Sequence, residues 1–261
     1  LNHPHILSVS DFGETPGGLL FIVSELLRGQ PLSLILERTG PLPLARVLRL
    51  FTQILGAVEE AHSFDIVHRD IKPDNIIVTT LRSGEDVVKV VDFGIAKVND
   101  RSVQGSQRIT IQGQVFGTPA FMSPEQARAH EVTPASDLYS CGMLLFNLLA
   151  GHPPFQSESI VEVMSSQLFE TPPPICEVAP QCGENPELDA VLARAMQKDP
   201  SDRFSSASEF LQAFKNAVST AAERPVSCRF CGEPNAIEAK FCSSCGGRLR
   251  EDTLPGRDSR L

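Results

Sequence analysis

Hydrophobic and polar positions along the first third of the chain predict two strands, one long helix and a hairpin. The apolar runs "HILSVSDFG" and "GLLFIVSELL" flank the turn-forming stretch "ETPGG", which predicts two adjacent strands. Apolar residues recur with helical spacing from Leu44 to Val58, so we expect a helix that ends near His62. The β-branched runs "NIIVTT" and "VVKVVDFG", joined by "LRSGED", predict a β-hairpin.

Beyond Phe93 the pattern changes to a long loop and then to helices. A stretch rich in Gly, Ser and Gln runs to Pro124, and helical patterns dominate from Ser136 onward. These patterns are "SDLYSCGMLLFNLLAG", "SESIVEVMSSQLF", "PELDAVLARAMQ" and "SASEFLQAFKNAV", with a Pro-rich connector between the second and the third. Helical order is expected to stop near Val218. Strands followed by segregated helices predict an α+β fold.

Composition and charge narrow the class of protein. The chain has 261 residues, of which 41% are apolar and 21% charged, as is typical of a globular domain with room for a small extra module. The net charge of −9 argues against a general nucleic-acid binder, since such binding depends on cations that meet phosphates. No apolar run approaches the roughly 20 residues that span a bilayer, and no secretion signal opens the chain. We therefore expect no membrane segment in this chain, no specific nucleic-acid partner and a cytoplasmic location.

The stretch "VHRDIKPDN" gathers side chains that suit phosphate chemistry. Asp70 can act as a base toward a substrate hydroxyl, Lys72 can neutralise a phosphate oxygen, and Asn75 offers a neutral oxygen to a hard cation. Asp92, at the end of the next apolar strand, adds a carboxylate, and Mg²⁺ prefers one or two carboxylates together with phosphate oxygens. Together these groups predict phosphoryl transfer. His68, beside them, is expected to hold the loop rather than to carry protons.

Five motifs, in order, resemble those of the serine/threonine protein kinases that bacteria share with eukaryotes. "HRDIKPDN" is similar to the catalytic loop of that family, "DFG" at 92–94 to its metal loop, and "GTPAFMSPE" at 117–125 to its substrate-docking loop. "DLYSCG" at 137–142 resembles the helix that anchors the C-lobe, and "DPSDRF" at 199–204 resembles the late arginine motif. The resemblance implies a protein-kinase-like fold with a partial N-lobe sheet and a complete helical C-lobe. It also implies an enzyme that uses ATP and Mg²⁺ (or Mn²⁺) and acts on Ser and Thr hydroxyls of proteins.

The resemblance assigns a role to each position of the catalytic and metal loops. Asp70 would be the catalytic base, and Lys72 would contact the γ-phosphate. Asn75 and Asp92 would hold Mg²⁺. Thr118 would hydrogen-bond near Asp70 and help to set the preference for Ser and Thr.

Further roles follow from the resemblance for the adenine site and the C-lobe. The backbone of Glu25 and Leu27 would take the adenine edge, with the small Ser24 at the gatekeeper position. Glu125 and Arg203 would form a buried ion pair that shapes the C-lobe, the alternative being an ordinary surface pair.

The long loop carries candidate regulatory residues. Arg69 and Lys97 could together bind a phosphate on this loop and order it by charge-assisted hydrogen bonds. Thr110 lies where similar bacterial kinases autophosphorylate, and Ser102 and Ser106 are weaker candidates. The alternative is that Thr110 is an exposed loop residue without a role.

Three parts that kinases place before the catalytic loop are missing from this sequence: the glycine-rich phosphate loop, the strand-three Lys and the helix-C Glu. "LNHPHI" resembles the segment that follows helix C, and the first residue is Leu rather than Met. The run "LLFIVSELL" would also expose an apolar edge. These features predict a fragment of a longer kinase, with little activity by itself, rather than a genuine short form.

Four of the seven cysteines form two Cys-x-x-Cys pairs, and "KFCSSCGGRL" resembles the zinc-ribbon family. Four thiolates in two such pairs suit a closed tetrahedral Zn²⁺ site better than redox chemistry or spare thiols. Residues 224–250 hold five cations and two acids, a charge that would allow weak contact with nucleic acid. Docking to a partner protein or a purely structural role is favoured instead. The predicted ligands are Cys228, Cys231, Cys242 and Cys245, whereas Cys141, Cys176 and Cys182 are expected to be packing or loop residues.

These patterns predict a domain order along the chain. A kinase domain covers residues 1–218 (1–27 as N-lobe remnant, 28–218 as C-lobe), followed by a linker at 219–226, a zinc ribbon at 227–249 and a flexible tail at 250–261. The leading interpretation is a serine/threonine protein kinase regulated by phosphorylation of its long loop. The alternative is a non-catalytic, kinase-like scaffold, although a scaffold would have no need of Asp70, Lys72, Asn75 and Asp92 together.

Overall fold

The computed structural model describes residues 1–93, 119–223, 226–228, 230–235 and 239–249. The chain divides into two compact units, Leu1–Lys215 and Asn216–Leu261. The tail predicted at 250–261 lies outside the described residues. In the part of the chain that is described, no helix combines the length and apolar character that crossing a bilayer requires.

The strands of the first unit form two small antiparallel sheets. β1 (Val9–Glu14) pairs with β2 (Leu20–Ser24). The second sheet has the order β3-β4-β5, with β3 at Gln30–Pro31, β4 at Ile76–Thr80 and β5 at Asp86–Val90. Both strand pairs predicted from the sequence are therefore confirmed.

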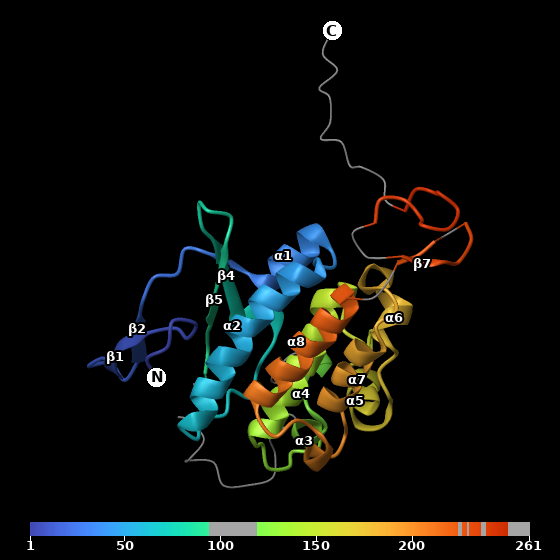
Figure 1. The fold of residues 1–261 in the computed structure, drawn as a ribbon. Helices are drawn as coiled ribbons and strands as arrows, with labels where there is room; N and C mark the ends of the chain where they lie inside the picture. The colour runs from blue at the N-terminus through green and yellow to red at the C-terminus, as the bar shows by residue number, and fades with distance from the viewer. Residues whose placement is uncertain (94–118, 224–225, 229, 236–238, 250–261) are drawn as a thin grey trace. The chain divides into compact units, whose positions relative to one another are not determined.

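Helices are the main elements of the remaining described residues (Figure 1), and the long helix predicted from Leu44 is confirmed as α2. The helices of the described residues are α1 (Leu32–Thr39), α2 (Leu44–Ser63), α3 (Pro124–Ala127), α4 (Pro134–Ala150), α5 (Ile160–Phe169), α6 (Ile175–Val178), α7 (Pro186–Ala195) and α8 (Ala207–Glu223).

The core of the first unit is built around α4. Every residue of α4 from Ser136 to Leu149 is buried, which explains why its sequence is apolar on all sides rather than along one stripe. α2 packs against α4 with an apolar face, and α8 lies beside both (Figure 1). Phe51 of α2 makes edge-to-face contacts with Phe210 and Phe214 of α8, at ring-centroid distances of 5.4 and 5.6 Å. Such aromatic contacts stabilise a core beyond their buried area.

The helices differ from the sequence-based expectation in α1 and at the end of α8, and the one-turn helices α3 and α6 were not predicted either. α1 was not predicted, because a helix of two turns with buried Leu32 and Leu36 gives too short an apolar pattern. The prediction that helical order stops near Val218 is wrong, since α8 continues to Glu223 and takes up most of the expected linker. The stretch at 219–223 has no apolar stripe, but it is rich in alanine, which has the highest helix propensity.

The β1–β2 pair exposes an apolar surface, as expected from the run "LLFIVSELL". All five residues of β2 are exposed, and Phe12 of β1 is 79% exposed. The pair is tied to the larger sheet by the backbone of Leu7, whose N–H donates to Val90 at 3.0 Å, and by the ion pair between Lys89 and Glu25. Isolated two-stranded sheets are marginally stable in water, so these ties help to hold the pair in place.

Candidate active site and metal site

One buried carboxylate from α4 holds the loop that carries Asp70. Asp137 is 1% exposed and accepts hydrogen bonds from the backbone N–H groups of His68, at 2.7 Å, and Arg69, at 2.8 Å. Its Oδ2 also lies 2.8 Å from Nε2 of His62. Arg69 has a φ of 72°, a left-handed conformation that costs a non-glycine residue about 1–3 kcal/mol. The contacts to Asp137 therefore stabilise a loop conformation that the backbone alone disfavours.

His68 connects the two loops of the candidate site through its ring. Nε2 lies 2.8 Å from the carbonyl oxygen of Val91, and Nδ1 accepts a hydrogen bond from the N–H of Asp70 at 3.3 Å. Both contacts suit the neutral tautomer with its proton on Nε2. Burial lowers the pKa of His68, which Asp137 offsets only in part, so the ring stays neutral. The predicted structural role of His68 is confirmed.

The side chains of Lys72 and Asn75 both contact one carboxylate oxygen of Asp70. Asp70 Oδ2 lies 2.8 Å from the ammonium of Lys72 and accepts a hydrogen bond from the side-chain amide of Asn75 at 3.0 Å. The same amide nitrogen donates to the backbone oxygen of Asp70 at 2.8 Å. Because the side-chain nitrogen of Asn75 is bound to Asp70, the side-chain oxygen of Asn75 is the atom that remains to bind a cation. The carboxylate of Asp70 is thus oriented, while 45% of its side chain is exposed.

The antiparallel pairing of β4 and β5 brings Asp92 to the same place. Asn75 precedes β4 and Asp92 follows β5, and the register pairs Ile76 with Val90. The N–H of Val91 donates to the carbonyl oxygen of Asn75 at 3.0 Å, so Asp92 emerges next to Asn75 at one end of the sheet. Asp92 has a φ of 62° and is exposed. Strained backbone at a non-glycine residue is common at functional sites.

Arg69, the predicted phosphate ligand, has an unusual environment. Its Nε is buried and has no hydrogen-bond partner among the described residues. The other predicted residues of the long loop, namely Lys97, Ser102, Ser106, Thr110 and Thr118, lie outside the described part of the chain.

The predicted adenine-binding segment follows β2. The carboxylate of Glu25 lies 2.6 Å from Lys89 and accepts a hydrogen bond from the N–H of Ser8 at 2.9 Å. These bonds, that from Lys89 first, lower the pKa of Glu25. The side chain of Glu25 is therefore engaged, and its backbone N–H donates to the carbonyl oxygen of Ser8 at 3.1 Å. The backbone carbonyl of Glu25 and the backbone of Leu27 are the groups that could meet an adenine. Their binding to adenine stays a prediction.

Two residues that hold the catalytic loop were not predicted from the sequence to do so. Asp137 belongs to the motif "DLYSCG", but its hydrogen bonds to the catalytic loop come from a distant part of the chain. Gln126, whose side-chain amide donates to the backbone oxygen of Arg69 at 2.6 Å, gave no signal. The nearest signal was the pattern Ser123-x-x-Gln126, a capping box that marks the start of α3.

The predicted pair of Glu125 and Arg203 is a buried, bidentate ion pair. Its two N–O distances are 2.7 and 2.9 Å, and the Arg203 side chain is fully buried. Arg203 also donates to the carbonyl oxygens of Ala135, Gln197 and Lys198. Burial alone would raise the pKa of Glu125, but hydrogen bonds from Arg203 and Ser136 lower it below its ordinary value. The alternative of a surface pair is thereby excluded.

Substituting Gln for Glu125 is expected to lower the free energy of unfolding by about 3–5 kcal/mol, because it leaves the buried guanidinium of Arg203 without a counter-charge. Urea unfolding measures the change. Glu209→Gln is a matched control, because Glu209 pairs with Arg194 where both side chains are more than a third exposed. That change should cost less than about 1 kcal/mol, and equal losses for the two variants would contradict the prediction. Because the pKa of Glu125 is lowered, the pair stabilises the fold at neutral pH, and this contribution is lost as the pH falls through the lowered pKa.

In the second unit the four predicted zinc ligands lie together. Their sulfur atoms are all within 4.8 Å of one another. The Sγ atom of Cys228 is 3.5 Å from that of Cys245, and the Sγ atom of Cys231 is 3.6 Å from that of Cys242. Tetrahedral Zn–S bonds of about 2.3 Å would place the sulfurs about 3.8 Å apart. The cluster therefore fits a Zn²⁺ ion closely.

The backbone around the cluster repeats in the two Cys-x-x-Cys turns. Gly232 donates to the carbonyl oxygen of Cys228 at 2.8 Å, and Gly246 donates to that of Cys242 at 3.0 Å. Both glycines have positive φ, 76° and 72°. Hydrogen bonds from the backbone amides of Cys245 and Ser244 lower the pKa of Cys242 to about 6, which favours its thiolate. Although a hydrogen bond from the backbone of Glu233 acts to lower it, the pKa of Cys231 is instead raised to about 12, chiefly by its contact with the sulfur of Cys245, so the shift at Cys242 is not shared by all four thiols.

Asn235, in β7 (Pro234–Asn235), is a residue of this site that the sequence did not indicate. β7 pairs with β6 (Val226–Ser227). Asn235 is 5% exposed, and its amide nitrogen lies 2.6 Å from the carbonyl oxygen of Glu233 and 3.5 Å from the sulfur of Cys242. Its oxygen accepts from the N–H of Ser243 at 2.7 Å. Asn235 thus links the two turns and orients one ligand.

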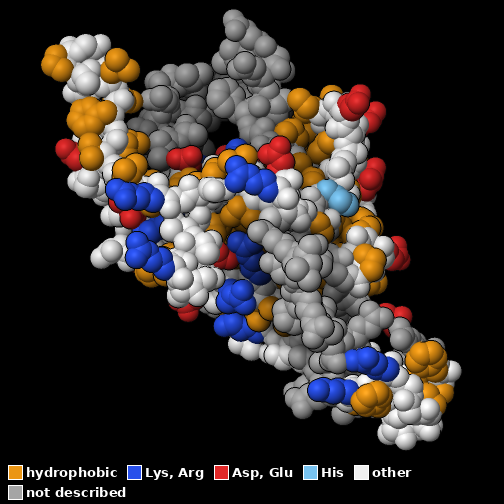
Figure 2. Space-filling model, turned by 90° about the horizontal axis from the view of Figure 1, so that it is seen from above, with side chains coloured by type: hydrophobic (Ala, Val, Ile, Leu, Met, Phe, Trp, Pro, Cys, Tyr) orange, Lys and Arg blue, Asp and Glu red, His pale blue; other side chains and the backbone are white. Residues whose placement is uncertain are grey.

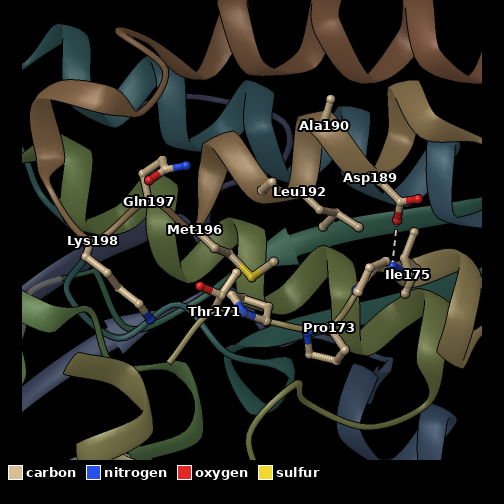
Figure 3. Close-up of a pocket in the computed structure, with 12 residues that line it drawn as sticks. Thr171, Pro173, Ile175, Asp189, Ala190, Leu192, Met196, Gln197 and Lys198 are labelled. Carbon is tan, nitrogen blue, oxygen red and sulfur yellow. Dashed lines mark hydrogen bonds between the residues drawn. The ribbon is translucent and has the colours of Figure 1, made fainter. Parts of the chain in front are cut away.

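A separate cavity of about 390 Å³ lies between α7 and the Pro-rich segment before α6 (Figure 3). Asp189 accepts from the N–H of Ile175 at 2.6 Å in its wall. The amine of Lys198 donates to Tyr139 at 3.2 Å, and burial lowers its pKa to about 8. No residue of the catalytic or metal loop lines this cavity. We therefore assign no catalytic role to it.

Comparisons with known proteins agree with this geometry. A family model described as "Protein kinase domain" matches residues 1–215. The serine/threonine-protein kinase pkn3 of Myxococcus xanthus is 41% identical over 261 residues, covering 98% of this chain and 47% of that protein. PknA of Mycobacterium tuberculosis, also a serine/threonine-protein kinase, is 37% identical over 229 residues, covering 86% and 49%. The crystal structure of the M. tuberculosis PknI kinase domain superposes with a TM-score of 0.62 at 30% identity, covering 83% of this chain and 73% of that one. The chain spans about half the length of the curated relatives it matches.

Proposed function

Because the chain belongs to the protein kinase family, we propose that the protein transfers the γ-phosphate of ATP to serine and threonine hydroxyl groups of other proteins. One observation carries this proposal: the carboxylate of Asp70 is held by Lys72 and Asn75 at the sheet end where Asp92 emerges. Phosphate transfer from radiolabelled ATP to casein by the natural-length protein, and its loss in Asp70→Asn, tests the proposal.

Each side chain of the loop would have a distinct task in this reaction. Asp70 would accept the proton of the substrate hydroxyl, through Oδ1, since Oδ2 is bound by Lys72 and Asn75. Lys72 would contact the γ-phosphate and neutralise part of its charge. Protein kinases use ATP and Mg²⁺, and the ion supplies further neutralisation of the phosphate oxygens. The amide oxygen of Asn75 and the carboxylate of Asp92 would hold it, and the backbone of Glu25 and Leu27 would bind the adenine.

The alternative function is a scaffold that uses the kinase-like surface without chemistry. It predicts that the natural-length protein transfers no phosphate, so that Asp70→Asn has nothing to abolish. The orientation of Asp70 by two neighbouring side chains favours the enzyme, because a binding surface has no need of it. The cytoplasmic location and the zinc-ribbon bounds expected from the sequence remain predictions, whereas most of the expected linker is helical.

Regulation is proposed to act through Arg69. Its buried Nε has no partner among the described residues, and a buried guanidinium nitrogen without a hydrogen bond is costly. A phosphate on Thr110 would supply acceptor oxygens to Arg69 and Lys97, and would order the loop that also carries Thr118. Thr118 is proposed to lie near Asp70 and to set the preference for Ser and Thr.

Thr110→Ala is expected to lower kcat by about tenfold or more, because the charge-assisted bonds that order the loop cannot form. Initial rates with casein, and mass spectrometry of the loop, measure the effect. Ser102→Ala serves as a control in the same loop and should leave kcat nearly unchanged. Unchanged turnover in Thr110→Ala would refute the regulatory role.

The cysteine cluster is proposed to bind Zn²⁺ through Cys228, Cys231, Cys242 and Cys245. The support is the clustering of the four sulfurs, all within 4.8 Å of one another, in two Cys-x-x-Cys turns. The ion would be structural, since four thiolates leave no open position for chemistry. A docking role for this module toward a partner protein is part of the proposal.

A further inference from the structure

An open groove on the first unit brings together arginines from three separate segments. It has a volume of about 490 Å³ and is lined by Arg28, just before β3, Arg38 of α1 and Arg46 of α2. The end of β4, including Thr79, contributes another part of its wall. We call it the arginine groove. Figure 2, turned so that the molecule is seen from above the view of Figure 1, shows Lys and Arg side chains at several places on this face.

The local charge is opposite to that of the whole chain. Residues 28–49 hold four arginines and one acid, Glu37, and Asp86, which pairs with Arg46, adds a second acid beside them. The chain as a whole carries a net charge of −9. A local group of cations in an otherwise acidic protein attracts anionic partners to that place.

The three arginines are held differently: Arg46 is paired with a carboxylate, whereas Arg28 and Arg38 have no carboxylate partner within the described residues. Arg46 uses Nε to bind the largely buried carboxylate of Asp86 at 2.7 Å, and Arg38 uses Nη1 to bind the side-chain oxygen of Gln30 at 3.0 Å. A guanidinium has five N–H donors, so both retain donors for a bidentate bond to a carboxylate. Arg28 is exposed and has no ion-pair partner within the ranges that the structure describes.

The segment that carries Arg28 lies directly against β4. A Cβ atom on Gly29 would come within 2.7 Å of both the carbonyl oxygen of Val78 and the hydroxyl of Thr79, so only glycine fits there. The hydroxyl of Thr79 also donates to the carbonyl oxygen of Arg28 at 3.1 Å. This close packing fixes the backbone from which the Arg28 side chain extends over the groove.

We propose that the arginine groove binds an acidic segment of a partner protein. Cations from three segments suit a chain that bears several carboxylates, and the apolar side chains of Ile35 and Val78 in the same wall suit an apolar residue of that chain. Nucleic acid fits less well, because its phosphates continue beyond the groove and would meet the acidic remainder of the chain, whereas the carboxylates of a short peptide segment can stay within the groove. The groove lies outside the Asp70 site, so this proposal is independent of phosphate transfer.

The test is a binding measurement on the whole chain without ATP. Fluorescence anisotropy follows the titration of fluorescein-labelled hexaglutamate with the protein at low salt. We expect saturable binding, weakened by NaCl, and a loss of affinity of about tenfold or more in the double variant R28E/R38E. R28Q/R38Q removes the charges without reversing them and should show a smaller loss. Arg128, exposed at the end of α3, provides the matched control R128E, which should bind as the unsubstituted chain does.

Three results would overturn the proposal. One is the absence of saturable hexaglutamate binding. Another is equal affinity of R28E/R38E and R128E, with circular dichroism spectra that confirm both are folded. The third is displacement of hexaglutamate by inorganic phosphate or by a thymidine oligonucleotide at the same charge concentration, which would mark a general anion site instead of a peptide site.

Discussion

Asp70→Asn is expected to lower kcat for phosphate transfer to a protein acceptor by about a thousandfold, because the substituted amide cannot accept the hydroxyl proton. The amide is nearly the same size as the carboxylate and can still meet Lys72 and Asn75, so KM for ATP should change little. Initial rates over a range of ATP concentrations, with the natural-length protein and casein, separate the two constants.

Asp74→Asn is the matched control for this measurement. Asp74 lies in the same short turn, Pro73–Asn75, but is exposed, and it should tolerate the change with kcat nearly unaltered. A kcat of Asp70→Asn within about twofold of the unsubstituted protein would refute the role of Asp70 as base. A fall in kcat for both variants would point to disturbance of the turn instead.

Removing Zn²⁺ is expected to unfold the cysteine module and leave the kinase unit intact. A module with two strands of two residues has little apolar core, and structural zinc in such modules contributes an apparent binding free energy of about 10–16 kcal/mol at neutral pH. The purified chain should contain an equimolar amount of zinc by elemental analysis. After treatment with a strong chelator, trypsin should cleave rapidly at Lys240 and Arg248, while the helices of the first unit remain protected.

Two cysteine variants control the zinc prediction. Cys242→Ser removes one proposed ligand and should abolish stoichiometric zinc, whereas Cys176→Ser changes a half-buried cysteine outside the cluster and should retain it. A chain that is free of zinc when purified under reducing conditions, yet resists trypsin at Lys240, would contradict a metal-dependent module.

The elements that could be predicted from the sequence are those with a long or locally complete signal. α2 has an apolar stripe over many turns, and β4 and β5 are joined by a recognisable turn, so both were found. α1 is too short for its period to stand out, and the last turn of α8 has no apolar stripe although it is helical. Tertiary packing and intrinsic helix propensity, which the hydrophobic pattern does not show, make these two segments helical.

The same limit applies to the sites. Asp70, Lys72 and Asn75 are within six positions of one another, and Asp92 follows a hairpin, so their proximity could be inferred from local structure. The contact of Asp137 with His68 and Arg69 spans almost seventy positions and arises only when α4 enters the core. The arginine groove joins three segments that no periodicity relates, so it could be recognised only in the folded chain.

The buried carboxylate of Asp137 has a consequence for the timing of catalysis. It joins the backbone of His68 and Arg69 to α4, a helix enclosed on all sides, so the neighbouring loop shares the rigidity of the molecular interior. In the proposed phosphate transfer, the entropy of ordering the catalytic groups would be lost once, when the chain folds, and not again at every turnover. Substrates would meet a loop that is already in position, and their binding free energy would be left for aligning the hydroxyl with the phosphorus atom.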